Sequence, residues 1–341
     1  MKRRSVLGLL AATATLPLTS FAARADDSLD QLHGQAKKEG AVVMYTSVPT
    51  FLLDRWKELF EKQYPGVPVT YFRSGTGKVL ARIESERRAH QVGGDVVWMA
   101  DPTTFAGLVA NKALISYQPP EWNKITLAKE PHGFYTAGRV LVGVLLVNKK
   151  LLPEPPKSFA DLTKPEYKGK IAIASPLVSG STNIIDGILW KDPAFGWNYF
   201  EALKKNDVLV LNDVPDVARS VASGERAAGI SLTMYKYQPE FKDSPMEIVF
   251  PTEGTVLVPS PLGILAGSPH PAAAKLFYRF LLSPPAQAVL SEAGIYPARG
   301  DVLPPAGLPA LKDVKSLLPD PEWIIAHQRE NTARWRQTFG G

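Results

Sequence analysis

The sequence predicts an α/β protein with two lobes, each a mainly parallel β-sheet flanked by helices, joined by a hinge of two strands. Strand-like and helix-like segments alternate over residues 41–110, and a second alternation covers residues 171–233. In each half of the chain, one strand runs directly into a loop rich in Ser, Thr and Gly that opens a helix. Ligands of such sheets bind beyond the carboxyl ends of the strands, so the two loops predict two lobes facing each other across a cleft.

The first lobe begins with strands and helices in alternation. Residues 95–99 form an apolar run, typical of a parallel strand covered on both faces, whereas Leu52, Trp56 and Phe60 share one helix face. The predicted elements are strands 41–46, 67–72 and 95–99, and helices beginning near Leu52, Gly77 and Pro102. The polar residues that follow these strands share one edge of the sheet: Ser47, residues 74–77 and Asp101.

Two extended segments are expected to connect the lobes. Residues 139–148 form the outward crossing, and two extended runs within residues 247–265 form the return. This interpretation assigns residues 26–138 and 257–341 to the first lobe and residues 139–256 to the second. The predicted second-lobe elements are strands 171–174, 208–211 and 227–233, and helices 182–190, 196–204 and 216–223. Helices that return to the first lobe open at Pro271, Pro284 and Pro321.

Residues 1–25 are expected to be a cleaved signal peptide. Lys2, Arg3 and Arg4 precede a moderately apolar stretch, and Ala23-Arg24-Ala25 is a small-residue cleavage site. The segment predicts a periplasmic location, and its arginine pair leaves both the Sec and the twin-arginine export routes open. The chain has no cysteine, which excludes disulfides, thiolate metal sites and a lipid-bearing cysteine. We therefore expect a freely soluble protein beyond the inner membrane.

The charge balance argues against a nucleic-acid partner. The formal net charge is +6, but the predicted signal peptide contains four of the 39 basic residues and no acidic residue. Without it, 35 Lys and Arg face 33 Asp and Glu, a net charge of about +2. We expect no binding to nucleic acid.

Known enzyme motifs fail when they are tested against the sequence. The loop at Gly75 to Lys78 is not a nucleotide phosphate loop, because Phe72 and Val79 stand at positions that need Gly and Ser or Thr. The five histidines are far apart and show no zinc-binding spacing. No serine-hydrolase elbow occurs. The sequence therefore predicts neither an enzyme nor a cofactor.

Two loops are candidate anion sites because each precedes a helix. Ser and Thr hydroxyls cap helix N-termini, Gly lets a ligand approach the backbone, and the helix dipole favours negative charge. Ordinary capping is the alternative for each loop, but both loops fall at the same structural position, one in each lobe. The candidate residues are Ser74, Gly75, Thr76 and Gly77 in the first lobe and Ser179, Gly180, Ser181 and Thr182 in the second.

Further candidates lie at strand ends, each with a structural alternative. Asp101 either contacts the ligand or caps the helix after Pro102. Arg139 either binds a cleft anion through its guanidinium or is a surface arginine. Tyr235 and Tyr237 alternate on an extended stretch, so both either face the cleft or cover the edge of the core. The other candidates are Ser47, Thr233 and Asp213, the last of which also fits a turn at a helix start.

Several long stretches resemble one protein family. These are VLLVNKKLLP, SFADLTKPEYKGKIAIASP and HPAAAKLFYRFLLSPPAQ, together with YTSVP, the SGTG loop and DVVWMAD. They are similar to periplasmic solute-binding proteins of ABC transporters, in the branch with ferric-iron, aminoethylphosphonate, sugar-phosphate and polyamine binders. The resemblance covers the whole mature chain. It implies the type 2 periplasmic binding fold, a monomer that closes on one ligand, and delivery to a membrane permease with a cytoplasmic ATPase.

The resemblance also narrows the ligand. Iron binders of this branch carry two adjacent tyrosines, whereas here Lys236 follows Tyr235, and they usually carry a His where this chain has Ser47-Val48-Pro49. Ferric iron needs several anionic oxygen or nitrogen ligands. We therefore expect a small anion, such as a phosphonate, phosphate ester or carboxylate, with ferric iron on Tyr235 as the alternative. A sensor partner or an enzyme on the same fold remains open.

Overall fold

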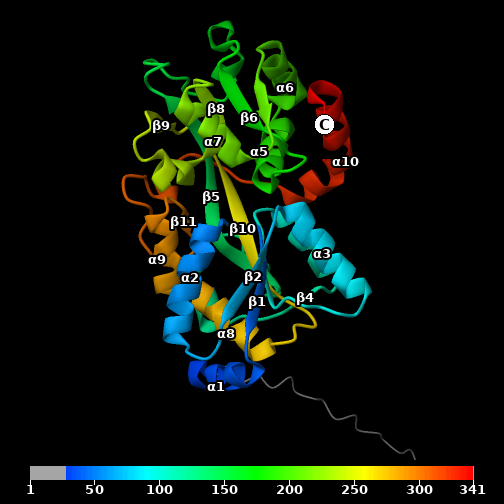
Figure 1. The fold of residues 1–341 in the computed structure, drawn as a ribbon. Helices are drawn as coiled ribbons and strands as arrows, with labels where there is room; N and C mark the ends of the chain where they lie inside the picture. Colours follow the sequence, from blue (N-terminus) through cyan, green and yellow to red (C-terminus); the bar gives the residue numbers. More distant parts are fainter. Residues whose placement is uncertain (1–27, 341) are drawn as a thin grey trace, which may run out of the picture.

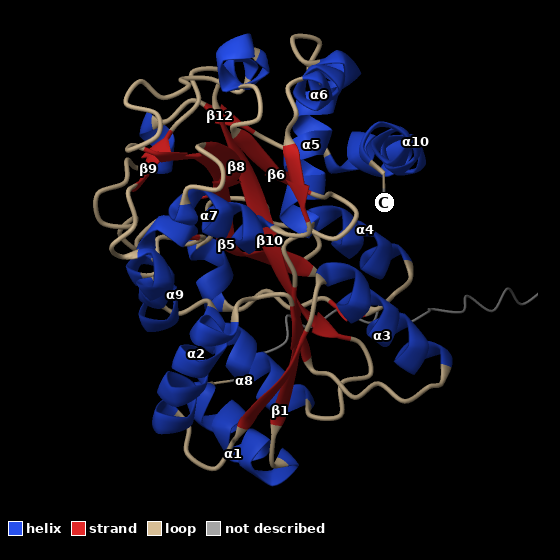
Figure 2. Cartoon of the chain, turned by 45° about the horizontal axis from the view of Figure 1, so that its top comes forward, coloured by secondary structure: helices blue, strands red, loops and turns tan. Residues whose placement is uncertain are grey.

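The computed structural model describes residues 28–340, and the signal peptide predicted for residues 1–25 lies outside this range. Two lobes lie one above the other and are joined by long strands (Figures 1 and 2). One sheet passes through both lobes in the order β2-β1-β3-β10-β5-β8-β6-β7. The predicted two-lobed α/β architecture is thus confirmed. None of the helices within residues 28–340 combines the length and the apolar character that crossing a membrane would require.

The first lobe follows the predicted alternation of strands and helices. Strand β1 lies between β2 and β3 and is parallel to both, whereas β10 is antiparallel to β3. The elements of this lobe are α1 (Leu29–Glu39), β1 (Val42–Thr46), α2 (Thr50–Gln63), β2 (Val69–Arg73), α3 (Thr76–Arg88), β3 (Val96–Trp98), α4 (Pro102–Ala110), β4 (Leu114–Ile115), α8 (Pro271–Leu281), α9 (Pro284–Glu292) and β11 (Tyr296–Pro297).

Aromatic side chains hold the helices of the first lobe to its sheet. Trp56 of α2 stacks on Trp98 of β3 with ring centroids 4.8 Å apart. Phe60, one turn further along α2, meets Phe277 of α8 edge to face at 4.9 Å. Both geometries are favourable for aromatic pairs, and all four rings are almost fully buried. The apolar helix face predicted for residues 52–60 is therefore the face that packs into the core.

The second lobe has a shorter sheet with helices packed on it. Strand β6 lies between β7 and β8 and is parallel to both, and all four of its residues are buried. The elements are β6 (Ile171–Ala174), α5 (Gly180–Lys191), α6 (Gly196–Lys205), β7 (Leu209–Leu211), α7 (Val214–Ser223), β8 (Ala228–Leu232) and β9 (Met246–Val249).

Strands β5 (Tyr135–Asn148) and β10 (Thr255–Leu265) form the hinge. They pair antiparallel from Gly143–Val256 to Tyr135–Gly263, with a register shift between Ser260 and Pro261. Strand β5 begins four residues before the predicted Arg139, because its first residues pair with β10 inside the first lobe. Each hinge strand therefore contributes to the sheets of both lobes, which lets one lobe rotate against the other without breaking either sheet.

Helix α10 (Pro321–Phe339), which the sequence assigns to the first lobe, contacts α4 of that lobe and also packs on α5 and α6 of the second lobe. The chain reaches it through β12 (Ser316–Leu317), which pairs with the start of β10. Trp323 packs edge-on against Trp190 of α5 at 5.1 Å, and Trp335 packs against Phe200 of α6 at 6.2 Å. Amphipathicity shows which face of a helix is apolar but not which lobe will cover it. The remaining lobe boundaries stay a prediction.

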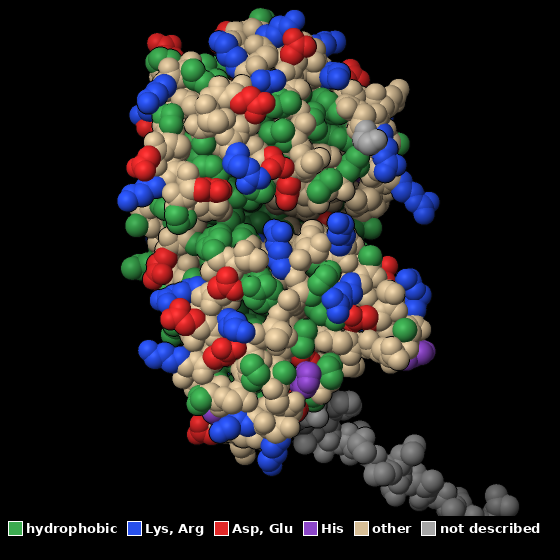
Figure 3. All heavy atoms as spheres, in the orientation of Figure 1, with side chains coloured by type: hydrophobic (Ala, Val, Ile, Leu, Met, Phe, Trp, Pro, Cys, Tyr) green, Lys and Arg blue, Asp and Glu red, His purple; other side chains and the backbone are tan. Residues whose placement is uncertain are grey.

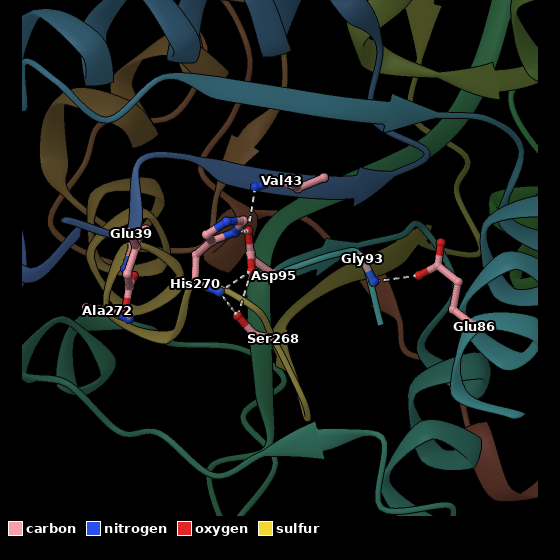
Figure 4. Close-up of polar contacts among 9 residues, drawn as sticks. Glu39, Val43, Glu86, Gly93, Asp95, Ser268, His270 and Ala272 are labelled. Carbon is pink, nitrogen blue, oxygen red and sulfur yellow. Dashed lines mark hydrogen bonds and ion pairs between the residues drawn. The ribbon is translucent and has the colours of Figure 1, made fainter. Parts of the chain in front are cut away.

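A buried carboxylate ties three segments of the first lobe together (Figure 4). Asp95 accepts hydrogen bonds from Val43 N at 2.6 Å, from Ser268 Oγ at 2.6 Å and from His270 N at 3.1 Å, and His270 Nδ1 lies 3.0 Å from it. Ser, His and Asp occur together here, but the serine hydroxyl donates to the carboxylate and not to the imidazole. A hydrolase triad needs the serine bonded to the histidine, so we interpret this cluster as structural.

Candidate functional site

A small cavity lies between the lobes, at the carboxyl ends of the strands. Its volume is about 70 Å³, and the surface above it is hollowed at the level where the two lobes meet (Figure 3). Residues from both lobes and from the hinge line it. The predicted site residues among them are Ser47, Gly75, Thr76, Arg139, Ser179, Gly180, Ser181, Asp213 and Tyr235.

Arg139 on hinge strand β5 provides a buried positive charge in this cavity. Its side chain is almost fully buried, with 2% of the residue exposed. Nε donates to Ser260 Oγ at 3.3 Å, while Nη1 has no hydrogen-bond partner among residues 28–340. Burial lowers the pKa of Arg139 to about 10, so the guanidinium stays charged at neutral pH. The guanidinium also lies over the Trp98 ring, 5.7 Å from its centroid, but no carboxylate among residues 28–340 forms an ion pair with it. A buried charge that has lost its ion-pair partner costs ~3–5 kcal/mol, and an anionic ligand would relieve that cost.

Tyr235 brings a phenol group to the same cavity. Burial raises the pKa of Tyr235 above its ordinary value, and the charge of Asp213 adds to the shift, while Arg139 and Arg73 oppose it. The phenol is therefore protonated at neutral pH and can both donate and accept a hydrogen bond. The charged groups that act on the phenol are thus the carboxylate of Asp213 and the guanidinium groups of Arg139, Arg73 and Arg219.

The start of helix α5 contributes hydroxyl groups and backbone N–H groups. Ser179 caps the helix, because its Oγ accepts from Thr182 N at 3.4 Å and lies 3.2 Å from Ser181 Oγ. Gly180 follows at the first helical position. The free N–H groups of the first turn and the helix dipole favour a negative charge at this point. The anion loop predicted from the sequence thus faces the cavity that contains Arg139.

The two lobes touch directly beside the cavity. A Cβ atom at position 180 would lie 2.9 Å from Thr76 Oγ1 and 3.2 Å from Asp101 Cβ, so any larger side chain there would press on these two residues. Asn183 of the second lobe donates to Asp101 Oδ2 of the first at 3.5 Å. Burial raises the pKa of Asp101, while hydrogen bonds from Thr103 and Asn183 oppose the shift. The N-termini of α3, α4 and α5 therefore meet where the two lobes touch.

Several predicted site residues lie outside the small cavity. Asp101 caps α4 by accepting from Thr103 N at 2.8 Å, so its capping role is the one the structure shows. Thr233 donates to the backbone oxygen of Gly294. The remaining residues that do not line the cavity are Ser74, Gly77, Thr182 and Tyr237.

The prediction that Tyr235 and Tyr237 both face the cleft is wrong. Residues 233–237 form a short 3-10 helix (η4) instead of an extended stretch, so the two side chains do not share a side. Tyr237 turns away, and its hydroxyl donates to Ala306 O at 2.9 Å. Alternate residues lie on the same side only in an extended strand. Nothing local in the sequence showed that β8 ends at Leu232.

Arg73 lines the cavity and was not predicted. It is the last residue of β2, directly before the loop that opens α3, and it is exposed. The expected strand ended one residue earlier, at Phe72. The sequence did contain a signal for Arg73, because a basic residue at the carboxyl end of a parallel strand lies where such sheets bind their ligands.

A larger cavity of about 840 Å³ opens on one side between α3, α4 and α10. Thr76, Val178 and Gly180 line both cavities and so separate them. The larger space is bordered by exposed residues, including Glu84 and Arg88, which solvent already satisfies. The small cavity, in contrast, contains a buried guanidinium whose Nη1 has no hydrogen-bond partner among residues 28–340.

Metal-binding clusters were sought in residues 28–340. No group of three or more His, Cys, Asp and Glu side chains there is arranged to hold a metal ion. Tyr235 in the cavity is thus the residue through which the iron alternative would have to act.

The sequence matches a known family over most of its length. Residues 41–296 fit the family model of bacterial extracellular solute-binding proteins. The chain therefore belongs to that family. Within it, the relatives and folds described next are those of the type 2 periplasmic binding proteins that serve ABC transporters, as the resemblance implied.

Individual relatives and structures agree with this assignment. A protein of Salmonella typhimurium named "Putative 2-aminoethylphosphonate-binding periplasmic protein" is 26% identical over 80% of this chain and 83% of its own. The periplasmic binding protein AfuA of Actinobacillus pleuropneumoniae, solved with fructose-6-phosphate, has a TM-score of 0.77 at 24% identity, over 88% and 98% of the two chains. Iron-bound HitA of Pseudomonas aeruginosa has a TM-score of 0.77 at 18% identity, over 88% and 99%. The two structural likenesses concern the fold alone.

Proposed function

We propose that this protein binds a small anionic solute between its lobes in the periplasm and delivers it to the permease of an ABC importer. The observation that carries the proposal is the buried, charged Arg139, whose Nη1 has no partner among the described residues. Arg73 and the first turn of α5 face the same cavity. A phosphonate, phosphate ester or carboxylate is the class of ligand that such a group of donors recognises.

Lobe closure gives this binding its role in transport. The hinge strands belong to both sheets, and the closed lobes meet through Gly180 and Thr76 beside the cavity. A ligand that bridges Arg139 on the hinge and the start of α5 stabilises this closed form, because it contacts groups that only closure brings together. The closed form is the state that we propose the permease recognises.

A thermal-melt panel with phosphonates, phosphate esters, carboxylates and polyamines tests the proposal. A ligand at 100 times its dissociation constant stabilises the protein by about 2.7 kcal/mol, which raises the melting temperature by several degrees. We expect one class of small anions to produce this shift and polyamines to produce none. A shift with polyamines alone would contradict the proposal. Ligand carried through purification is removed first by partial unfolding and dialysis.

Ferric iron is a second candidate because Tyr235 presents a phenol inside the cavity. A phenolate oxygen is a suitable donor for ferric iron, and Arg139 would then hold an accompanying anion. Ferric citrate and citrate alone are therefore included in the panel. Iron binding through Tyr235 would produce a visible absorption band that Tyr235→Phe removes, whereas a simple anion site would show no such band.

A further inference from the structure

Helix α10 is fixed to the second lobe, although it also comes close to α4 of the first lobe. Trp323 packs on α5 and Trp335 packs on α6, and Figure 1 shows α10 beside these two helices. Asp320, which caps α10, forms an ion pair with Lys191 of α5. The aromatic and ionic contacts that α10 makes with other elements within residues 28–340 all go to α5 and α6. We therefore expect α10 to move with the second lobe when the lobes rotate.

The larger cavity is the gap that separates α10 from the first lobe. Helices α3 and α4 line it from the first lobe, and α10 and the segment 176–183 line it from the second. Apolar side chains on both sides of this gap are incompletely buried. Ile325 of α10 is 44% exposed and Val178 is 53% exposed, while Leu80 of α3 is partly exposed on the opposite side. Leu108 of α4 is already buried, so Leu80 is the first-lobe leucine at the gap with apolar surface left to bury.

We propose that Ile325 and Leu80 form an apolar contact across this gap as it narrows, and that this contact sets the affinity for the ligand without touching it. Narrowing the gap removes apolar surface of both lobes from water, which favours the closed form in proportion to the area buried. Neither residue lines the small cavity. A ligand that binds only the closed form binds more tightly when that form is more populated. The inference rests on the proposed function and names residues that regulate the same site.

Spin labels on the two sides of the gap test the contact without any ligand. The chain has no cysteine, so Ser85→Cys on α3 and Arg329→Cys on α10, both at exposed positions, are labelled selectively. Double electron–electron resonance then measures the distribution of distances between the labels. We expect Ile325→Ser in this background to lower the ratio of short to long distances at least ~3-fold, because serine removes most of the apolar side chain.

Ala326→Ser is the matched control for Ile325→Ser. Ala326 is the exposed neighbour of Ile325 on α10 and does not line the gap. This control should leave the distance distribution as it is in the labelled native background. If Ile325→Ser also leaves the distribution unchanged, Ile325 does not favour the closed form and the inference is wrong.

Calorimetric titration with methylphosphonate and with acetate measures the effect on affinity. Ile325→Ser should weaken binding at least ~3-fold, in step with the change in the distances, and Ala326→Ser should not. Leu80→Ala should also weaken binding. The double variant Leu80→Ala/Ile325→Ser should lose less than the product of the two single effects, because both substitutions remove the same contact. Single effects that simply multiply would show that Ile325 and Leu80 do not meet.

The outcomes distinguish this inference from the function on which it rests. If Ile325→Ser shifts the distances but no phosphonate, phosphate ester or carboxylate of the thermal-melt panel binds the native protein, the contact stands and the proposed function is wrong. If an anion binds the native protein and Ile325→Ser with equal affinity, the function stands and the contact does not set the affinity.

Discussion

Arg139 is the residue on which we expect ligand binding to depend most. Replacing it with Met keeps the unbranched, apolar part of the side chain and removes the guanidinium group with its charge. We predict that Arg139→Met weakens binding of the anionic ligand by at least ~100-fold, because truncating one partner of a buried charge pair costs ~2–5 kcal/mol. The ligand-free variant should melt at the same temperature as the native protein or higher, since no unpaired charge remains buried. Calorimetric titration and a thermal melt measure the two effects.

Arg73→Met is the matched control for this prediction. Arg73 lines the same cavity but is exposed, so solvent and salt screen its charge. Its loss should weaken binding by ~10-fold or less, and the loss should shrink further at high salt. If Arg139→Met binds the ligand as tightly as the native protein, the buried guanidinium is not the anion site.

Asp186 predicts a pH dependence of stability that is independent of the ligand. It lies on α5, is 5% exposed, and its Oδ2 has no hydrogen-bond partner within residues 28–340. Burial raises the pKa of Asp186 well above its ordinary value of 3.8. When the pKa of a carboxyl group is higher in the folded state than in the unfolded state, the folded protein is most stable at pH values below the unfolded-state pKa. This part of the free energy of unfolding is lost as the pH rises through the folded-state pKa.

Asp186→Asn removes that titration. We predict that the variant is more stable than the native protein at pH 7, by ~1–3 kcal/mol, the usual cost of a buried polar group without a partner. The difference should vanish as pH falls toward ~4, where the native carboxyl is protonated. Denaturant unfolding between pH 4 and 8 measures it. Equal stability of the two proteins across this range would show that Asp186 finds a partner in solution.

Among the elements, helix α5 has two separate tasks. Its first turn, capped by Ser179, faces the ligand cavity. The middle of α5 packs against α10, because Gly187 leaves room for Ile324 of that helix. A Cβ at position 187 would lie 2.8 Å from Ile324 Cγ1. Glycine inside a helix usually costs ~1 kcal/mol relative to alanine, so close packing of a second helix explains its use here.

Gly187→Ala tests this packing, because its effect on the free energy of unfolding should be opposite to the usual effect of Gly→Ala in a helix. In an exposed helix the substitution would stabilise by ~1 kcal/mol, but here we predict destabilisation by ~1–3 kcal/mol because the new methyl group collides with Ile324. Adding Ile324→Ala should make Gly187→Ala neutral or stabilising in that background, and a double-mutant cycle measures the coupling. Additive effects of the two substitutions would mean that α10 does not press on α5 at this point.

The proposed function requires one lobe to rotate against the other, and a disulfide should stop that rotation. A Cβ atom at position 180 would lie 3.5 Å from Thr76 Cβ, within the ~3.5–4.5 Å range of disulfides. The chain has no cysteine of its own. We predict that oxidised Thr76→Cys/Gly180→Cys is locked closed, so that bound ligand dissociates at least ~100-fold more slowly than after reduction.

Stopped-flow release of ligand, with and without reductant, measures the effect of the lock. Each single cysteine variant serves as a control for the loss of the Thr76 hydroxyl and for the bulk added at position 180. Reductant should change the release rate of the double variant only. If the oxidised double variant releases its ligand at the reduced rate, binding does not require the closed contact between Thr76 and Gly180.

Most elements of this fold could be predicted because local signals mark them. Prolines at 102, 271, 284 and 321 each open a helix where the sequence indicated one. The prediction for Tyr237 failed where local signals end, and the position of α10 between the lobes was not foreseen. The pattern of residues 233–237 does not distinguish a strand from a 3-10 turn, and the apolar face of α10 does not identify the lobe that buries it.

By itself, the sequence determined the two-lobed α/β architecture, the family and the two polar loops at strand ends, because caps, breakers and periodicity depend on residues near one another in the chain. Only the tertiary structure decided that Arg139 is buried with a nitrogen that has no hydrogen-bond partner within residues 28–340, that Arg73 joins it, that Tyr237 does not, and that Thr76 and Gly180 meet. Burial and the lack of a partner depend on residues far apart in the chain, such as Arg139 and Ser260, which folding brings together.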